Sequence, residues 1–440
     1  MWQTIKNSFA DASIRKRIII TLLLLLVYRV GCFVPVPGLD FEVFSTTWDN
    51  SNNLLSMLNT ITGGSLQYGT LFALGIVPFI NASIIMQLLT LVIPKLERLS
   101  KDGEDGRKKI NQYSRYLSIL LAIVQAIGIV VSWRSSITGV FGSSQASQIF
   151  TMIFIIIILT GGSSFVMWLG ERITEYGIGN GTSLLIFVGI LATLGGDIWN
   201  AMIHAIPEQA KNGTYTGVWF LLGFVALIVV LFGLIVFVDN SERRIPVQYA
   251  KQIKGNKMYG GQSTHIPIKV NSGGVMPIIF ASSLIMFPQM IMQFADPNMT
   301  SGFVRWWYQW MGVGGYLYGP FMFLLIIFFA YFYAQIQFNP DDVARMIQQN
   351  GGFIPGIRAG KSTSDYLRKI NNRITLFGAI YLGIVALIPT YVLKLDGFSS
   401  IGLNSAFTAT GLLIVVSVAL ELDKQLQSQL LIKNNRGFLK

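Results

Sequence analysis

The chain has 440 residues, of which 52% are hydrophobic and only 12% are charged, about half of the roughly 25% typical of a soluble globular protein, so the composition argues against a water-soluble fold. An excess of 33 Lys and Arg over 21 Asp and Glu gives a net charge of +12, which favours an anionic partner such as a membrane surface or nucleic acid. One cysteine, Cys32, and two histidines far apart in sequence, His204 and His265, exclude an internal disulfide framework and argue against a metal or redox centre.

Ten stretches of the chain are mostly apolar over the roughly 20 residues that a helix needs to cross a bilayer. The first follows Arg15, Lys16 and Arg17, as a signal sequence would. We interpret it as a transmembrane helix because many spans follow and Arg29 lies where a cleavage site requires an apolar residue. The expected fold class is an all-α polytopic membrane protein. The predicted spans are 18–35, 73–93, 116–133, 149–169, 183–203, 218–238, 274–294, 318–338, 376–393 and 406–420.

The positive charges fall almost entirely on one side of this predicted membrane protein. With the N-terminus inside, 28 of the 33 Lys and Arg lie in cytoplasmic segments, and Arg29 lies within the first span. The remaining four, Arg134, Lys211, Arg305 and Lys394, lie outside. Because Lys and Arg are retained on the cytoplasmic side, this bias supports the count of ten spans and predicts that both termini are cytoplasmic.

Ten spans divide into two successive halves of five, residues 1–205 and 206–423, followed by a basic tail at 424–440. Two odd-numbered halves in succession have opposite topology. This arrangement permits an inverted repeat about an axis in the membrane plane, an architecture of transporters and channels.

Residues 38–72 form an external segment that carries no Lys or Arg. Its apolar run at 54–61 is too short to span a bilayer and is followed by Gly63, Gly64 and Gly69. Such a run either folds back as a re-entrant stopper or lies at the interface as a helix, and the sequence leaves both interpretations open.

Arg29 is the clear case of an ionisable side chain at membrane depth in the predicted spans. Ion-coupled transporters and intramembrane enzymes keep ionisable groups at this depth as relays or catalytic partners. The other polar residues there are amides and hydroxyls, and hydrogen bonding between packed helices is one interpretation of them. The glycine-rich segment at 177–182 has no following lysine and no preceding strand, so it does not fit a phosphate-binding loop. We expect it to form a tight turn and to allow close approach of the fourth and fifth spans.

Two predicted cytoplasmic loops, 239–272 and 339–373, are long for a helical bundle and mix Lys and Arg with Gly and amides. Contact with anionic lipid is one interpretation, and docking of a large soluble partner is the other. In the second loop Arg358 follows Pro355 and Gly356, which pre-set the backbone of a turn. A rigid frame of this kind favours specific recognition by arginine.

Several motifs together resemble the bacterial SecY family, which provides the pore subunit of the general protein-secretion channel. They occur in family order and cover nearly the whole chain. The resembling stretches are 33–38 (FVPVPG), 72–89 (FALGIVPFINASIIMQLL), 167–182 (MWLGERITEYGIGNGT), 243–246 (RRIP), 262–271 (QSTHIPIKVN) and 355–358 (PGIR).

The resemblance implies a clamshell of two inverted five-helix halves around an hourglass pore, with a lateral gate opposite the hinge between them. It implies an external plug at 54–65, whose apolar side chains are Leu54, Leu55, Met57, Leu58 and Ile61. It also implies an apolar constriction ring, which can fit around an extended chain of any sequence and can exclude ions when closed. Thr182 stands where the family usually has an aliphatic residue. By motif alignment the ring comprises Ile76, Ile80, Thr182, Ile186, Ile279 and Ile414.

The second, third and seventh spans line the lateral gate in the resembling family. That resemblance places Gln87, Gln125, Asn271, Ser282 and Ser283 at the gate. We expect Gln87, Gln125 and Asn271 to satisfy one another's hydrogen bonds and to hold the gate shut, since each amide is both donor and acceptor. The alternative is that they are ordinary packing contacts.

The implied function is a protein-conducting channel that translocates unfolded polypeptides across the bacterial cytoplasmic membrane and releases transmembrane segments into lipid, without enzymatic activity, cofactor or metal. Implied partners are SecE-like and SecG-like membrane subunits, signal sequences, anionic lipids, and the SecA motor ATPase or the ribosome, whose RNA phosphates attract Lys and Arg. The docking residues would be Arg243, Arg244, Lys251, Lys254 and Arg358. The alternative is an ion-coupled secondary transporter of a small solute, which the inverted topology permits but which needs membrane-embedded acids.

Overall fold

The computed structural model describes residues 9–39, 59, 62–134, 137, 145–200, 202–203, 216–249, 252–254, 257–259, 263–274, 276–295, 301–312, 315–392 and 409–437. Within these ranges each of the ten predicted spans falls on a helix of its own, in the predicted order. These helices are α2 (Ala12–Gly31), α5 (Val77–Val92), α7 (Glu104–Ser132), α8 (Gln145–Tyr176), α9 (Gly181–Asn200), α11 (Thr216–Asp239), α12 (Met276–Ala295), α14 (Tyr318–Gln337), α16 (Lys361–Val392) and α18 (Ala409–Gly437).

The helices differ in how fully they meet the requirements for a membrane span. Among the described residues, five helical segments are long and apolar enough on their own, and the bent pair of α5 and α6 (Pro94–Lys101) makes a sixth. The apolar parts of α9 and α12 are shorter, and α2 carries basic residues near both ends. Basic side chains near helix ends can reach the membrane interface, so such a helix can still span.

α5 and α6 meet at a bend of 106°. Pro94 lies in the first turn of α6, and a proline disfavours the helical conformation of the residue before it. Ile93 is accordingly extended, with φ −97° and ψ 111°. The bend therefore ends α5 at the point where the apolar run ends.

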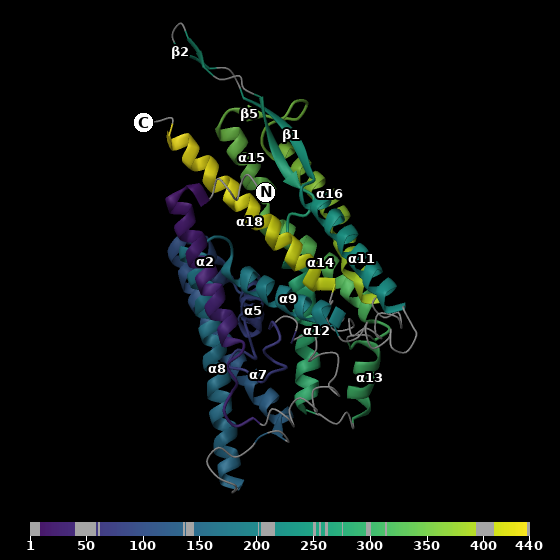
Figure 1. Ribbon diagram of the computed structural model, residues 1–440. Coiled ribbons are helices and arrows are strands. Elements are labelled where there is room, and N and C mark those ends of the chain that lie inside the picture. Colours follow the sequence, from purple (N-terminus) through teal and green to yellow (C-terminus); the bar gives the residue numbers. More distant parts are fainter. Residues whose placement is uncertain are drawn as a thin grey trace.

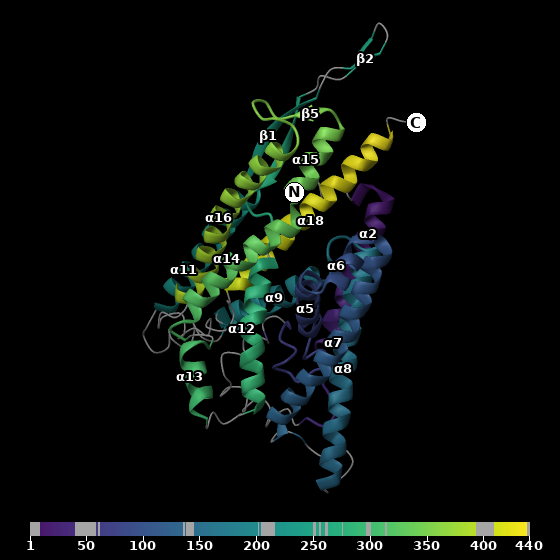
Figure 2. The ribbon, with the colours of Figure 1, turned by 180° about the vertical axis from the view of Figure 1, so that it is seen from behind.

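The helices form two groups (Figures 1 and 2). α2, α7 and α8 lie on one side and α11, α14 and α16 on the other, with α9 and α12 between them in both views. α18 packs against α11 and α16 of the second group and against α9 between the groups. A large apolar core cluster draws buried side chains from α2, α5, α8, α9, α11, α12, α14, α16 and α18.

The first long loop contains a β hairpin. β1 (Glu242–Tyr249) pairs antiparallel with β4 (Ser263–Lys269), and β5 (Gly352–Phe353) from the second loop pairs with the end of β1. β2 (Gln252–Lys254) and β3 (Lys257–Tyr259) form a separate ribbon. Ile245 and Val247 of β1 and Ile268 of β4 pack against α15 (Pro340–Gln349) and α16 in a small core of their own. The two loops therefore form one folded unit outside the helical bundle.

The hairpin, α15, the first turns of α2 and the end of α18 all lie at one end of the molecule (Figure 1). The short helix α13 (Gly302–Trp310) lies at the other end. It runs back along α12, because the Tyr308 hydroxyl donates to the carbonyl oxygen of Gln289 at 3.1 Å. The basic first turns of α2 and the basic segments that follow α11 and α14 thus share one end of the bundle.

Candidate functional site

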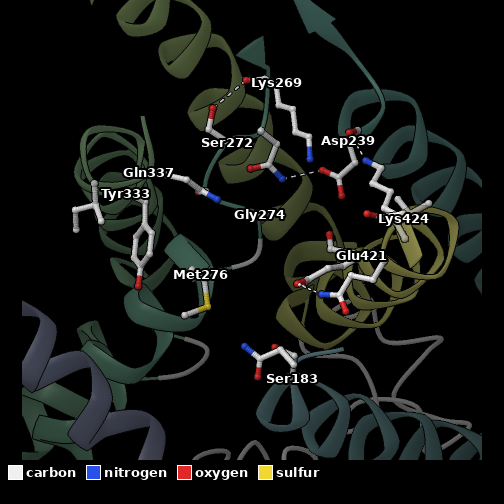
Figure 3. A pocket seen from close by; sticks show the side chains of 18 residues that line it. Ser183, Asp239, Lys269, Ser272, Gly274, Met276, Tyr333, Gln337, Glu421 and Lys424 are labelled. Carbon is white, nitrogen blue, oxygen red and sulfur yellow. Dashed lines mark hydrogen bonds between the residues drawn. The ribbon is translucent and has the colours of Figure 1, made fainter. Parts of the chain in front are cut away.

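A pocket of about 600 Å³ opens beside the base of the hairpin (Figure 3). Its wall is formed by the starts of α9 and α12, the ends of α11 and α14, the chain that follows β4, and one face of α18. We call this pocket the vestibule. Its uncharged polar side chains are Asn180, Ser183, Asn271, Ser272, Tyr333, Gln337, Ser417, Gln425 and Ser428, and its charged ones are Asp239, Lys269, Glu421 and Lys424.

Two of the charged side chains of the vestibule are held by hydrogen bonds, one to an amide and one to the backbone. Asn271 Nδ2 donates to Asp239 Oδ1 at 2.8 Å, and Lys424 Nζ donates to the carbonyl oxygen of Asp239 at 3.0 Å. The pKa of Lys424 is lowered from its ordinary value, first because burial removes water from the ammonium group and second because Lys269 is nearby. The vestibule wall thus carries two acids and two lysines among otherwise uncharged side chains.

Five of the six predicted ring residues belong to the large apolar cluster. Ile76, Ile186, Ile279 and Ile414 are buried in it, and Ile80 packs against it partly buried. The cluster thus brings together side chains from α5, α9, α12 and α18, in addition to the residue that precedes α5.

The sixth predicted ring residue, Thr182, has a different local role. Its hydroxyl donates to Asn180 Oδ1 at 2.7 Å, and its backbone N–H donates to the same oxygen at 3.1 Å. Asparagine commonly caps the first turn of a helix in this way. The hydroxyl of Thr182 therefore takes part in the hydrogen bonds that cap the start of α9.

Vestibule and ring residues follow each other on three helices. The pairs are Ser183 and Ile186 on α9, Met276 and Ile279 on α12, and Ser417 and Ile414 on α18. Residues three apart lie on the same face of a helix. The vestibule wall therefore leads, one turn further into the bundle, to buried isoleucines.

The glycine-rich turn before α9 confirms the expected close approach of α8 and α9. Gly179 has a φ of +87°, which strains any residue with a side chain. A Cβ atom at Gly181 would collide with the carbonyl oxygen of Gly170 on α8. Glycine at 181 is therefore a packing requirement.

The five predicted plug side chains, Leu54, Leu55, Met57, Leu58 and Ile61, lie outside the described residues. The backbone just after them is tied to α2, because the Tyr28 hydroxyl donates to the carbonyl of Thr62 at 3.3 Å. Arg29 Nη1 donates to the carbonyl of Gly63 at 3.0 Å. The sequence marked Arg29 as unusual, but nothing in it identified this carbonyl as the partner.

The predicted amide cluster is wrong in its contacts, because each of its members has a different environment. Gln87 accepts a hydrogen bond from the Tyr333 hydroxyl at 2.6 Å and donates to Ser83 at 3.3 Å. Asn271 is bonded to Asp239 in the vestibule, and Nε2 of the buried Gln125 has no hydrogen-bond partner among the residues that the structure describes.

The two serines assigned to the gate lie on α12. Ser282 is buried and donates to the carbonyl of Ile279 on its own helix at 2.9 Å, and Ser283 is partly buried. A hydrogen bond between helices at the predicted gate is made instead by Tyr333 of α14, which donates to Gln87 of α5. The sequence did not single out Tyr333, because Gln87 is 246 positions away.

The predicted docking residues that the structure describes lie on the folded unit formed by the two long loops. Arg243 and Arg244 are exposed on β1, and Arg244 pairs with Glu242 at 2.7 Å. Arg358 is exposed after Gly356, whose φ is +80°, and its carbonyl accepts a bond from Thr363 at 2.9 Å. Lys251 lies outside the described residues, and only the backbone of Lys254, in β2, is described.

The chain is similar to known proteins over almost its whole length. The model of one protein family, described as SecY, matches residues 70–422. The protein translocase subunit SecY of Streptomyces galbus is 46% identical over 446 residues, which cover 99% of each chain. That of Mycobacterium tuberculosis is 44% identical over 451 residues, again with 99% of each chain covered.

Solved structures show the same fold. A protein-conducting channel matches with a TM-score of 0.65 at 20% identity, over 95% of this chain and 93% of that chain. Sec61 in a canine ribosome–channel complex matches with a TM-score of 0.60 at 19% identity, with the same coverage. These likenesses confirm the predicted fold class, ten spanning helices in two inverted halves around an hourglass pore.

Proposed function

The chain belongs to the SecY family, and from this premise we propose how it acts as the protein-conducting subunit of a translocase in the bacterial cytoplasmic membrane. Unfolded polypeptides enter at the vestibule and cross through the isoleucine ring, and apolar segments leave sideways into lipid. Family membership favours this function over the alternative of an ion-coupled solute transporter. We further propose that the chain performs no covalent chemistry and needs no cofactor.

The observation that carries this proposal is the order in which vestibule residues and buried isoleucines follow one another along α9, α12 and α18. On each helix a vestibule residue is followed, three positions deeper, by an isoleucine of the buried cluster. A polar funnel keeps an unfolded chain hydrated, whereas a narrow apolar ring can contact any side chain and exclude water and ions when the chain is absent.

We assign the plug role to residues 54–65, because the backbone that follows its apolar run is held by Tyr28 and Arg29. We assign the gate role to the contact between α5 and the second half of the chain, which we call the seam. The Gln87–Tyr333 bond joins α5 to α14 there. Breaking such a seam would expose the pore to lipid without disturbing the helices themselves.

The end of the molecule that carries the hairpin is the cytoplasmic end in this proposal, with both termini on that side. Exposed Arg243, Arg244 and Arg358 on one folded unit suit a large anionic partner. Solved relatives include channels described in complex with ribosomes. We propose the ribosome and a SecA-like motor as alternative partners here, with SecE-like and SecG-like subunits beside the bundle and signal sequences and anionic lipid at the gate.

Reconstitution tests the function directly. Proteoliposomes that contain this chain and its small membrane partners should take up a radiolabelled unfolded precursor when the motor and ATP are present, and should not accumulate a radiolabelled small solute. Solute uptake driven by an ion gradient, without precursor transport, would contradict the proposal. Vesicles prepared with an Ile186→Arg variant, which places a charge in the ring, provide a matched control for the pore.

A further inference from the structure

The two chain segments at the base of the hairpin are bound to each other. Val270 N–H donates to the carbonyl of Ser241 at 3.1 Å, which extends the pairing of β1 and β4 toward the bundle. Asn271 Nδ2 donates to Asp239 Oδ1 at 2.8 Å. On the outer side, Gly378 of α16 lies against the carbonyl of Val270 and leaves no room for a side chain. The base of the hairpin is therefore a packed unit.

One side chain of α18 reaches this unit. Lys424 Nζ donates to the carbonyl oxygen of Asp239, the last residue of α11, at 3.0 Å (Figure 3). The final carbonyls of a helix have no partner within the helix and carry the negative end of its dipole. A lysine ammonium group is a suitable partner for them, and Lys424 is partly buried where it makes this contact.

The same base is connected to two helices that carry proposed ring residues. α12 begins at Met276, just after the second segment of the hairpin, and carries Ile279. α18 carries Ile414, ten residues before Lys424, or about 15 Å along the helix axis. A displacement of the base thus reaches α12 through the chain itself and can reach α18 through Lys424.

We propose that Lys424 is a positioning residue that couples the hairpin to α18, so that a partner docked on the hairpin changes the isoleucine ring. This inference rests on the proposed function, in which a partner binds the exposed arginines of the hairpin. Lys424 acts through the backbone of Asp239 and need not touch the passenger.

The first test separates partner binding from transport. Lys424→Gln removes the ammonium group, Lys424→Arg retains a cationic donor, and Lys108→Gln removes a charge from a lysine whose side chain is 71% exposed. In proteoliposomes we expect Lys424→Gln to bind the SecA motor with wild-type affinity while the rate of ATP-driven transport at saturating motor falls about five-fold or more, the lower end of usual allosteric coupling. Lys424→Arg and Lys108→Gln should transport at nearly the wild-type rate.

A second test measures the coupling without transport. Because Cys32 is the only cysteine, a Cys32→Ser background allows two spin labels to be placed at Thr264→Cys on β4 and Gln427→Cys on α18, both exposed positions. The distribution of label distances should broaden in Lys424→Gln and stay narrow in Lys424→Arg. A capping role alone would lower the unfolding temperature and leave this distribution unchanged.

A wild-type transport rate in Lys424→Gln, an equal loss in Lys424→Arg, or an unchanged distance distribution would each overturn the coupling. Failure of the proposed docking has a separate signature. If charge reversal of Arg243 and Arg244 left motor affinity unchanged, the hairpin would not be the docking site, although the distance measurement would still report whether Lys424 holds α18 to it.

Discussion

The hydrogen bond between Tyr333 and Gln87 tests whether the seam between α5 and α14 is a gate. Tyr333→Phe removes only the hydroxyl and leaves Gln87 Oε1 without this donor. Hydrogen bonds between membrane helices contribute about 0.6 kcal/mol on average and about 1.7 at most, and an unpaired buried acceptor costs about 1–3 kcal/mol. Tyr333 is 8% exposed, so we expect about 1 kcal/mol, or about a five-fold shift toward the open seam.

The assay is export of a series of signal sequences graded in hydrophobicity. Burial of one methylene group contributes about 0.8 kcal/mol, so Tyr333→Phe should export a signal that is about one methylene less hydrophobic than the wild-type threshold. Gln87→Leu should shift the threshold in the same direction. Because both changes remove the same contact, the double variant should shift it less than the sum of the two.

Tyr331→Phe is the matched control on the same helix. Its hydroxyl donates to the carbonyl of Asn372 at 3.3 Å, a contact between α14 and α16 within the second half. It should leave the signal threshold unchanged. An unchanged threshold in Tyr333→Phe, or an equal shift in Tyr331→Phe, would refute the gate assignment.

Three further changes address other parts of the molecule. Gly181→Ala should destabilise the protein by about 1–3 kcal/mol through overpacking against α8, measured as a lower unfolding temperature in detergent. Gly195→Ala on the same helix should be neutral or stabilising, because no described atom outside its own helical turn lies within 4 Å of the added Cβ. Arg29→Met should raise resting ion conductance in planar bilayers, because the carbonyl of Gly63 loses its donor; conductance equal to wild type would count against anchoring of the plug. Arg358→Glu should abolish motor-driven transport at unchanged abundance, because loss of a charged contact at an interface can cost about 2 kcal/mol or more, and normal ATP-dependent transport by the purified variant would disprove docking at this turn.

The order and approximate bounds of the ten spans could be predicted from the sequence, because a membrane span requires a long apolar stretch and most of the chain consists of such stretches. The confirmed tight turn at Gly179 and Gly181 was predictable for a related reason, since only glycine tolerates such a φ and such a close approach. In both cases the requirement is local in the sequence.

The hairpin was not predicted, although Ile245 and Val247 alternate with polar residues as a half-buried strand requires. Pro246 argued against a strand, because proline cannot donate to a sheet and is confined to edges. β5 reaches only Gln248 and Tyr249 of β1. Among the described residues, the strand therefore has a neighbour on one side only at Pro246, and proline is tolerated there.

The amide cluster failed for a different reason. Placing Gln87, Gln125 and Asn271 on three neighbouring spans does not fix their depth or the direction in which each helix face points. Asn271 lies at the base of the hairpin and is bonded to Asp239, whereas Gln87 is bonded to Tyr333 of α14, which is not one of the three spans assigned to the gate. Hydrogen bonds between helices depend on tertiary geometry that a list of spans does not contain.

The change from a polar to an apolar wall within three residues on α9 and α18 determines how thin the electrical barrier of the proposed ring is. One helical turn rises only about 5.4 Å, and an extended chain advances about 3.3 Å per residue, so about two residues of a passenger occupy the ring at a time. The side chains of Lys and Arg are long enough to keep their charged ends in water while their stems contact apolar surface. A cationic residue can therefore cross such a ring with its charge hydrated first on one side and then on the other, and never has to be buried whole.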